Sequence, residues 1–295
     1  MCYNMIMKEG IVLLLGRPNV GKSTFVNNII GTKVAITSPK PQTTRFPIQG
    51  LYQDERGRII FTDTPGIFDK APDFMSKKIN ESALRELNKK ADVVLYFIDP
   101  TRRRDYEEAR VLGLARQVKA PVLLVFNKTD LENPYTAQYV FLEDEFKDVF
   151  HISALQNQHI KPLMAKIFEL LPERDETDTQ IPEDLIYPLL SMDSKTFIAE
   201  LIREKVFIMM GEEIPYTTTA VVDQINERDN GTMYVKARIL TTNDRYKRML
   251  IGHEGRKIKE MGSYARKEIA LATNKKVFLD LTVETDPDWQ SSLYS

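Results

Sequence analysis

The chain contains a single cysteine, Cys2, among its 295 residues. One cysteine cannot form an internal disulfide, which excludes the disulfide-stapled scaffolds of small secreted proteins. No apolar run approaches the roughly 20 residues that cross a bilayer, and residues 1–7 are too short for a secretory signal. We therefore expect a cytoplasmic protein, although an organellar protein without its transit peptide would have the same composition.

The chain also has almost no net charge, with 41 basic and 42 acidic residues. A chain of this length can bury two hydrophobic cores. An acidic, polar run lies between Pro172 and Pro182, as is typical of a linker. We predict a first domain at 1–172, a linker at 173–183 and a second domain at 184–295.

A glycine-rich run at residues 16–24 says most about function. It fits G-x-x-x-x-G-K-[ST] and lies between an apolar run at 11–15, typical of a buried strand, and a helix start at 25–30. Backbone N–H groups of such a loop close around phosphate oxygens, and the following helix directs its positive end at them. An ordinary strand–turn–helix connection seldom has this complete pattern. The predicted nucleotide-binding residues here are Gly16, Arg17, Pro18, Asn19, Val20, Gly21, Lys22, Ser23 and Thr24.

A second motif predicts which base is bound. Asn127, Lys128 and Asp130 form N-K-x-D directly after the apolar strand candidate 122–126. The Asp130 carboxylate can accept two hydrogen bonds from guanine, whereas adenine offers neither donor and would leave a buried acceptor unpaired. We expect Asn127 to tie this loop to the phosphate loop and the Lys128 stem to cover the base.

Three further loops complete the predicted site. Asp63, Thr64, Pro65 and Gly66 form D-x-x-G after the strand candidate 58–61. Asp63 is placed to hold Mg²⁺ through water beside Ser23, and Gly66 can present its N–H to the γ-phosphate. Either Thr44, which we favour narrowly, or Thr43 supplies a further hydroxyl to Mg²⁺. The backbone of Ser153, Ala154 and Leu155 follows another strand and can contact the guanine carbonyl.

The first domain alternates strand and helix patterns, with helices predicted at 74–90, 104–118, 134–147 and 160–171. This alternation predicts a doubly wound, mostly parallel α/β sheet whose ligand lies at the carboxyl ends of the strands. Three consecutive arginines, Arg102–Arg104, are expected to begin the second of these helices on an exposed face.

The five motifs, in this order, resemble the translation-factor-like GTPases and most closely the Era family. Their second hallmark is a KH domain, and a G-x-x-G loop follows at Gly252–Gly255, with a strand candidate at 233–240 before it and another at 276–281 after it. Ten basic and three acidic residues between 245 and 276 give this region a local charge of +7, which favours RNA over an ordinary solvated face. The predicted RNA-binding residues are Ile251, Gly252, His253, Glu254, Gly255, Arg256, Lys257, Ile258 and Lys259.

The resemblance implies a P-loop GTPase domain followed by a smaller α+β, type II KH domain. It also implies GTP hydrolysis with Mg²⁺, binding to 16S-type ribosomal RNA near its 3′ end, a role in small-subunit assembly, and peripheral association with the inner membrane. We expect a monomer. Ile67 occupies the place where many small GTPases have a water-orienting glutamine, so we expect slow turnover in which Asn19 helps hold K⁺.

The predicted catalytic residues are Lys22, Asn19, Thr44 and Gly66. Two alternatives stay open: a related RNA-modification or ribosome GTPase, and an RNA-binding scaffold with little hydrolysis. A carboxylate at Glu254 is unfavourable beside phosphates, so loop contacts to RNA are expected to be weaker than is usual in KH domains.

Overall fold

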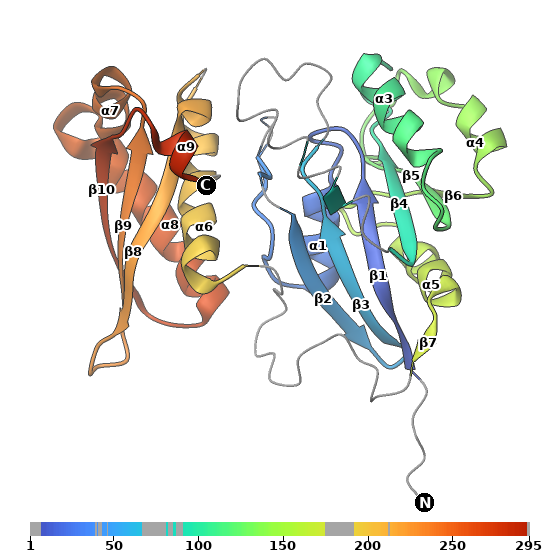
Figure 1. The fold of residues 1–295 in the computed structure, drawn as a ribbon, viewed down its shortest axis with the longest axis horizontal. Coiled ribbons are helices and arrows are strands. Elements are labelled where there is room, and N and C mark those ends of the chain that lie inside the picture. Colours follow the sequence, from blue (N-terminus) through green and yellow to red (C-terminus); the bar gives the residue numbers. More distant parts are fainter. Residues whose placement is uncertain are drawn as a thin grey trace, which may run out of the picture. The chain divides into compact units, whose positions relative to one another are not determined.

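The computed structural model describes residues 7–38, 40, 43–45, 47–66, 81, 85–86, 91–174, 192–211 and 213–293. Ile67 therefore lies outside the described residues. The same holds for the predicted helix at 74–90, except for residues 81, 85 and 86. The chain divides into two compact units (Figure 1). Unit 1 comprises Met1–Ala35 and Thr44–Ser191, and unit 2 comprises Ile36–Thr43 and Met192–Ser295.

Unit 1 is built on one sheet with the strand order β2-β3-β1-β4-β5-β6, and β7 pairs with β1. The strands β3, β1, β4, β5 and β6 run parallel, while β2 and β7 are antiparallel to their neighbours. Their bounds are β1 (Met7–Leu15), β2 (Ile48–Asp54), β3 (Gly57–Asp63), β4 (Val93–Ile98), β5 (Val122–Phe126), β6 (Asp148–His151) and β7 (Glu173–Arg174). The mostly parallel α/β sheet is as predicted.

Helices cover both faces of this sheet. The helical elements are α1 (Lys22–Ile30), α3 (Tyr106–Ala115), η1 (Thr136–Gln138), α4 (Phe141–Glu145) and α5 (Ile160–Leu170). Side chains alternate along β4, so that Tyr96 joins a core with α3 and α4, while Phe97 packs edge-on against Phe25 of α1 with ring centroids 5.4 Å apart. Alternation of this kind is what a doubly wound sheet requires, because both faces are buried.

Three sequence predictions differ from the structure in detail. The helix predicted at 134–147 is divided into η1 and α4, because the chain bends at Tyr139 and buries that ring completely. The residues Arg102–Arg104 precede α3, which begins at Tyr106 with Asp105 as its N-cap. The predicted linker begins at residue 173, but Glu173 and Arg174 form β7 beside β1, where the Arg174 Nε donates to the Glu9 carbonyl at 3.2 Å.

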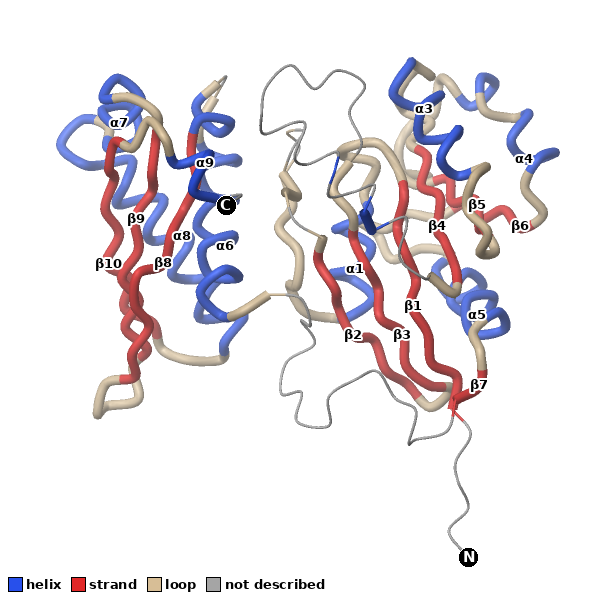
Figure 2. Tube along the Cα trace, in the orientation of Figure 1, coloured by secondary structure: helices blue, strands red, loops and turns tan. Residues whose placement is uncertain are grey.

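Unit 2 has the element order α–β–β–α–α–β of a type II KH domain, followed by the short helix α9 (Figure 2). In its sheet, β9 lies between β8, which is antiparallel to it, and β10, which is parallel. The bounds are α6 (Ser194–Met209), η3 (Ile214–Thr217), β8 (Thr218–Glu227), β9 (Met233–Thr241), α7 (Asp244–Ile251), η4 (His253–Gly255), α8 (Arg256–Thr273), β10 (Val277–Thr285) and α9 (Trp289–Leu293). The strand β9 buries Val235, Ala237 and Ile239, which alternate with more exposed residues.

Within the described parts of the chain, none of the helices has the length and apolar character that crossing a membrane would require.

Candidate nucleotide and RNA sites

The glycine-rich loop encloses the amine of Lys22. This residue begins α1, and its Nζ donates to the carbonyls of Gly16 and Arg17 at 3.0 Å each. Gly21 is in the left-handed region with φ of 101°, and a Cβ there would lie 2.2 Å from the Nδ2 of Asn127, so only glycine fits. Burial lowers the pKa of Lys22 to about 8, against the attraction of Asp63. The amine is therefore mostly charged at neutral pH and suited to pair with phosphate.

Three side chains with oxygen atoms that can bind a metal ion converge beside this loop. The Ser23 Oγ donates to Asp63 Oδ2 at 2.5 Å and lies 3.2 Å from the Thr44 Oγ1. The other oxygen of Asp63 is enclosed and has no hydrogen-bond partner in the part of the chain that the structure describes. Burial raises the pKa of Asp63, although Lys22 opposes the shift. An unpaired carboxylate oxygen beside two hydroxyls fits a hard cation such as Mg²⁺.

The same geometry bears on the choice between the two threonines. The hydroxyl of Thr43 donates to the Lys40 carbonyl at 2.6 Å, whereas the hydroxyl of Thr44 lies beside Ser23. The structure thus places Thr44, the favoured residue, with the other candidate Mg²⁺ ligands.

The D-x-x-G segment contacts the glycine-rich loop. The Thr64 hydroxyl donates to the Leu14 carbonyl at 2.7 Å. A Cβ on Gly66 would lie 2.6 Å from the Pro18 nitrogen, so the two backbones touch and no side chain fits between them. This contact places Gly66 on the Pro18 side of the loop.

The base-recognition loop is held by Asn127, which makes the contact expected of it. Its Nδ2 donates to the Val20 carbonyl at 2.8 Å, and its Oδ1 accepts from the Ala154 N–H at 2.8 Å. One side chain therefore joins three predicted segments of the site. One carboxylate oxygen of Asp130 is enclosed without a hydrogen-bond partner among the described residues, as an acceptor awaiting the N–H groups of guanine would be.

A residue that the sequence reasoning missed supports Lys128. Asp99 follows β4 directly, is fully buried, and accepts from the Lys128 Nζ at 2.5 Å. Its other oxygen accepts from the backbone and hydroxyl of Thr101. An aspartate at the carboxyl end of a buried parallel strand is a signal that could have revealed it. Leu155 of the predicted set is 70% exposed.

The G-x-x-G turn of unit 2 has a positive φ at three of its four residues. The φ angles are 71° at Gly252, 53° at Glu254 and 73° at Gly255. The side chains of His253 and Glu254 are exposed, and Arg256 donates from Nη2 to His253 Nδ1 at 2.8 Å. The Glu254 carboxylate lies 4.0 Å from the same Arg256 nitrogen, which partly offsets its charge in this exposed turn.

A groove of about 480 Å³ lies between α8 and β10. Of the predicted RNA-binding residues, Ile258 and Lys259 line it, while Ile251 ends α7. Sequence reasoning missed the remainder of its wall. The groove is lined by Ile258, Lys259, Gly262, Ser263, Arg266, Phe278, Leu279 and Leu281. Apolar walls with cationic rims suit unstacked bases and their phosphates.

Comparisons with known proteins match both units. A family model described as "50S ribosome-binding GTPase" matches residues 11–128, and a KH-domain model matches residues 213–290. The GTPase Era of Halothermothrix orenii is 38% identical over 292 residues, covering 97% of this chain and 96% of that protein. The GTPase Era of Carboxydothermus hydrogenoformans is 38% identical over 297 residues, covering 97% and 95%.

Two solved structures have the same fold over almost the whole chain. A variant of Aquifex aeolicus Era bound to GDP and aluminium fluoride has a TM-score of 0.87 and 33% identity, covering 96% of each chain. A structure of Era with MgGDPNP and nucleotides 1506–1542 of 16S ribosomal RNA has a TM-score of 0.87 and 32% identity, covering 96% of this chain and 95% of that one.

Proposed function

The chain belongs to the Era GTPase family, and on this basis we propose that it is a GTP-hydrolysing switch that binds the 3′ end of small-subunit ribosomal RNA and assists assembly of the small ribosomal subunit. One observation carries the proposal: the same chain joins a guanine-nucleotide site to a KH domain with an open groove. The solved Era complex contains a GTP analogue and a 16S RNA segment together.

We assign the nucleotide chemistry to five residues. Lys22 neutralises charge on the β- and γ-phosphates, and Gly66 donates its N–H to the γ-phosphate. Thr44 and Ser23 supply hydroxyls to Mg²⁺, with Asp63 holding the ion through water. When bound, Mg²⁺ stabilises the negative charge that develops as water attacks the γ-phosphate.

We further propose that K⁺ assists hydrolysis through Asn19. This residue is in the left-handed region, with φ of 63°, at the turn of the glycine-rich loop. Ile67 occupies the place where many small GTPases have a water-orienting glutamine. A monovalent cation beside the phosphates would supply positive charge to the site instead. The effect belongs in kcat because that charge matters most in the transition state.

For RNA, we propose that the backbone of the Gly252–Gly255 turn approaches phosphates while bases enter the groove between α8 and β10. Arg256, Lys257 and Lys259 would meet phosphates, and Ile258 would contact bases. We expect the protein to act in the cytoplasm as a monomer, with peripheral membrane association. We place the linker between the two domains after Arg174, the last residue of β7.

The second candidate function is that of a related RNA-modification or ribosome GTPase. One observation favours it, the description of the matching GTPase model as 50S ribosome-binding. The third possibility is a scaffold with little hydrolysis. Sedimentation with separated 30S and 50S subunits, with GDPNP or GDP, distinguishes the first two. Binding to 50S and not 30S would overturn the proposed partner.

The full proposal is tested by GTP turnover with and without an RNA of the 16S 3′ sequence, in KCl and in NaCl. We expect GTP turnover to rise with K⁺. In a parallel binding measurement, we expect the RNA of the 16S 3′ sequence to bind more tightly than its scrambled counterpart. Turnover indistinguishable from buffer under every condition would favour the scaffold, and equal affinity for both RNAs would contradict the assigned site.

A further inference from the structure

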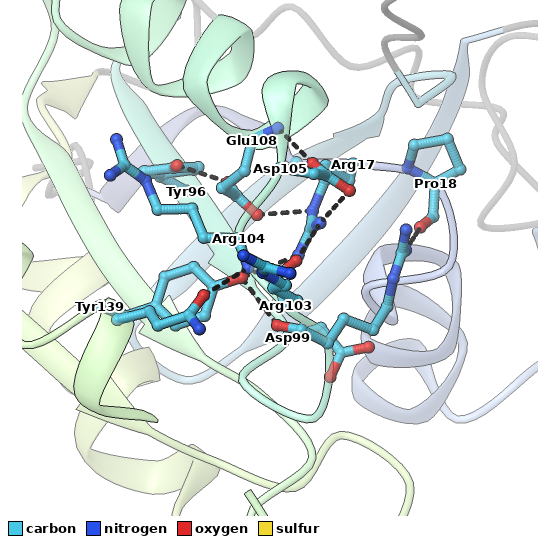
Figure 3. Close-up of polar contacts among 12 residues, drawn as sticks. Arg17, Pro18, Tyr96, Asp99, Arg103, Arg104, Asp105, Glu108 and Tyr139 are labelled. Carbon is cyan, nitrogen blue, oxygen red and sulfur yellow. Dashed lines mark hydrogen bonds and ion pairs between the residues drawn. The ribbon is translucent and has the colours of Figure 1, made fainter. Parts of the chain in front are cut away.

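Arg17 is the second residue of the glycine-rich loop, yet its side chain points away from the place of the phosphates. The guanidinium is fully buried and meets oxygens from three residues of the β4–α3 region and from Tyr139 (Figure 3). Nη1 donates to Asp105 Oδ2 at 2.9 Å and to the Arg103 carbonyl at 3.2 Å. Nη2 donates to the Tyr139 hydroxyl at 3.0 Å, and Nε lies 2.6 Å from Glu108 Oε2.

The partner carboxylate, Glu108, is itself buried and held in place. It lies on α3 with no exposed surface, and its other oxygen accepts from the Tyr96 hydroxyl of β4 at 2.6 Å. Burial raises the pKa of Glu108, and the attraction of Arg17 opposes that shift. A buried ion pair is weak evidence of stabilisation, because replacing it by apolar residues of similar volume is often neutral or stabilising.

A second arginine holds the next residue of the loop. The Arg102 Nη1 donates to the Pro18 carbonyl at 2.9 Å, and the Arg102 carbonyl accepts from the Tyr139 hydroxyl at 2.9 Å. Arg17 and Pro18 are thus both fixed immediately before the left-handed turn at Asn19. The β4–α3 loop begins at Asp99, which holds Lys128, so it supports the base loop as well.

This support acts on one side of the nucleotide site. Pro18 lies against Gly66, because a Cβ on Gly66 would be 2.6 Å from the Pro18 nitrogen. Gly66 is the residue expected at the γ-phosphate, whereas the backbone N–H groups at the start of α1 are expected to bind the phosphates that GDP retains. A displaced Arg17 would therefore disturb the γ-phosphate side and leave GDP contacts largely intact.

We propose that the buried Arg17–Glu108 pair, with Tyr96 and Tyr139, is a positioning device that sets the backbone of Pro18 and Asn19 for γ-phosphate transfer. This inference rests on the proposed GTPase function and adds a specific role to residues outside the ligand contacts. Arg17 holds the loop through an ion pair to Glu108 and through hydrogen bonds to Arg103, Asp105 and Tyr139. Lysine, with its single nitrogen, cannot reproduce this set of contacts.

The test compares Glu108→Gln, which keeps the side-chain shape, with Leu112→Ala, a control in the same core that removes apolar contacts and no polar group. Displacement of catalytic groups by about 1 Å can cost about 100-fold. For Glu108→Gln we therefore expect kcat to fall about 10- to 100-fold while the Kd for GDP stays within about twofold. Leu112→Ala should lower Tm and leave kcat per folded molecule unchanged.

Two further variants keep the test decisive if Glu108→Gln folds poorly. Tyr96→Phe removes only the hydroxyl on Glu108 and should give a smaller kcat loss with intact GDP binding. Arg17→Lys should also lower kcat, although it keeps the positive charge, because lysine cannot make the same set of contacts. The positioning role is overturned if kcat per folded molecule is unchanged in Glu108→Gln or Tyr96→Phe, or if GDP affinity falls in parallel with kcat. Absence of turnover in the wild type would instead contradict the proposed function.

Discussion

Replacing Asp130 by asparagine should change the base preference of the nucleotide site. In the structure one oxygen of this carboxylate is enclosed and has no hydrogen-bond partner in the described residues. In the proposed complex, that carboxylate accepts from the guanine N1–H and the exocyclic amine. An amide in its place presents N–H donors where guanine also has donors.

The size of the effect follows from the hydrogen bonds lost. A hydrogen bond to a charged group contributes about 1.5–3 kcal/mol, so two lost bonds weaken GTP binding by about 3–6 kcal/mol. Because about 1.4 kcal/mol is tenfold in affinity, we expect GTP to bind about 100- to 10,000-fold more weakly. Xanthine carries a carbonyl in place of the exocyclic amine, so XTP should accept a bond from the new amide and become the preferred nucleotide.

The assay is competition of GTP, XTP and ATP against a fluorescent GDP analogue for the wild type and Asp130→Asn. Glu132→Gln is the matched control, because it removes the same charge from an exposed residue two positions along the loop. The control should bind GTP as the wild type does. An unchanged ratio of GTP to XTP affinity in Asp130→Asn would refute the assignment of this residue to the base.

The remaining predictions concern the phosphate and RNA contacts. Lys22→Ala should lower kcat by about 100- to 1,000-fold with an unaltered circular dichroism spectrum, and an unfolded variant would show that Lys22 has a structural role instead. Asn19→Ala should give equal turnover in KCl and NaCl at matched ionic strength, whereas retained K⁺ stimulation would remove Asn19 from the cation site. Exchanging Gly252 and Gly255 for Asp should abolish RNA binding measured by filter retention without affecting GTP binding. Glu254→Lys should bind RNA more tightly and steepen the log–log salt slope by about 0.7; no gain at low salt would place the turn away from phosphate.

The segments of the candidate site can be identified from the sequence because each has a local pattern. The glycine-rich loop and N-K-x-D each combine a short pattern with a buried strand directly before it, and the structure brings both together through Asn127. The element order of the KH domain follows from the same kind of local pattern, with strands and helices on either side of the Gly252–Gly255 turn.

Other features depend on contacts that no local pattern contains. Thr43 and Thr44 are adjacent and chemically identical, and only the three-dimensional position of Ser23 separates them. Likewise, the wall of the RNA groove joins α8 to β10, so Phe278 could not be assigned to it from the G-x-x-G turn alone. Tyr139, between η1 and α4 where the predicted helix is interrupted, is fully buried in the core of unit 1.

Arg17 shows most clearly where a motif stops being informative. In G-x-x-x-x-G-K-[ST] the intervening positions are unrestricted, since phosphate is bound by their backbone and not by their side chains. The partners of Arg17 lie 88 residues away at Asp105 and 122 residues away at Tyr139. In the proposed positioning device, side chains that are distant in the sequence hold this part of the backbone. The motif therefore predicts which backbone atoms meet the nucleotide, whereas only the fold shows which side chains hold that backbone.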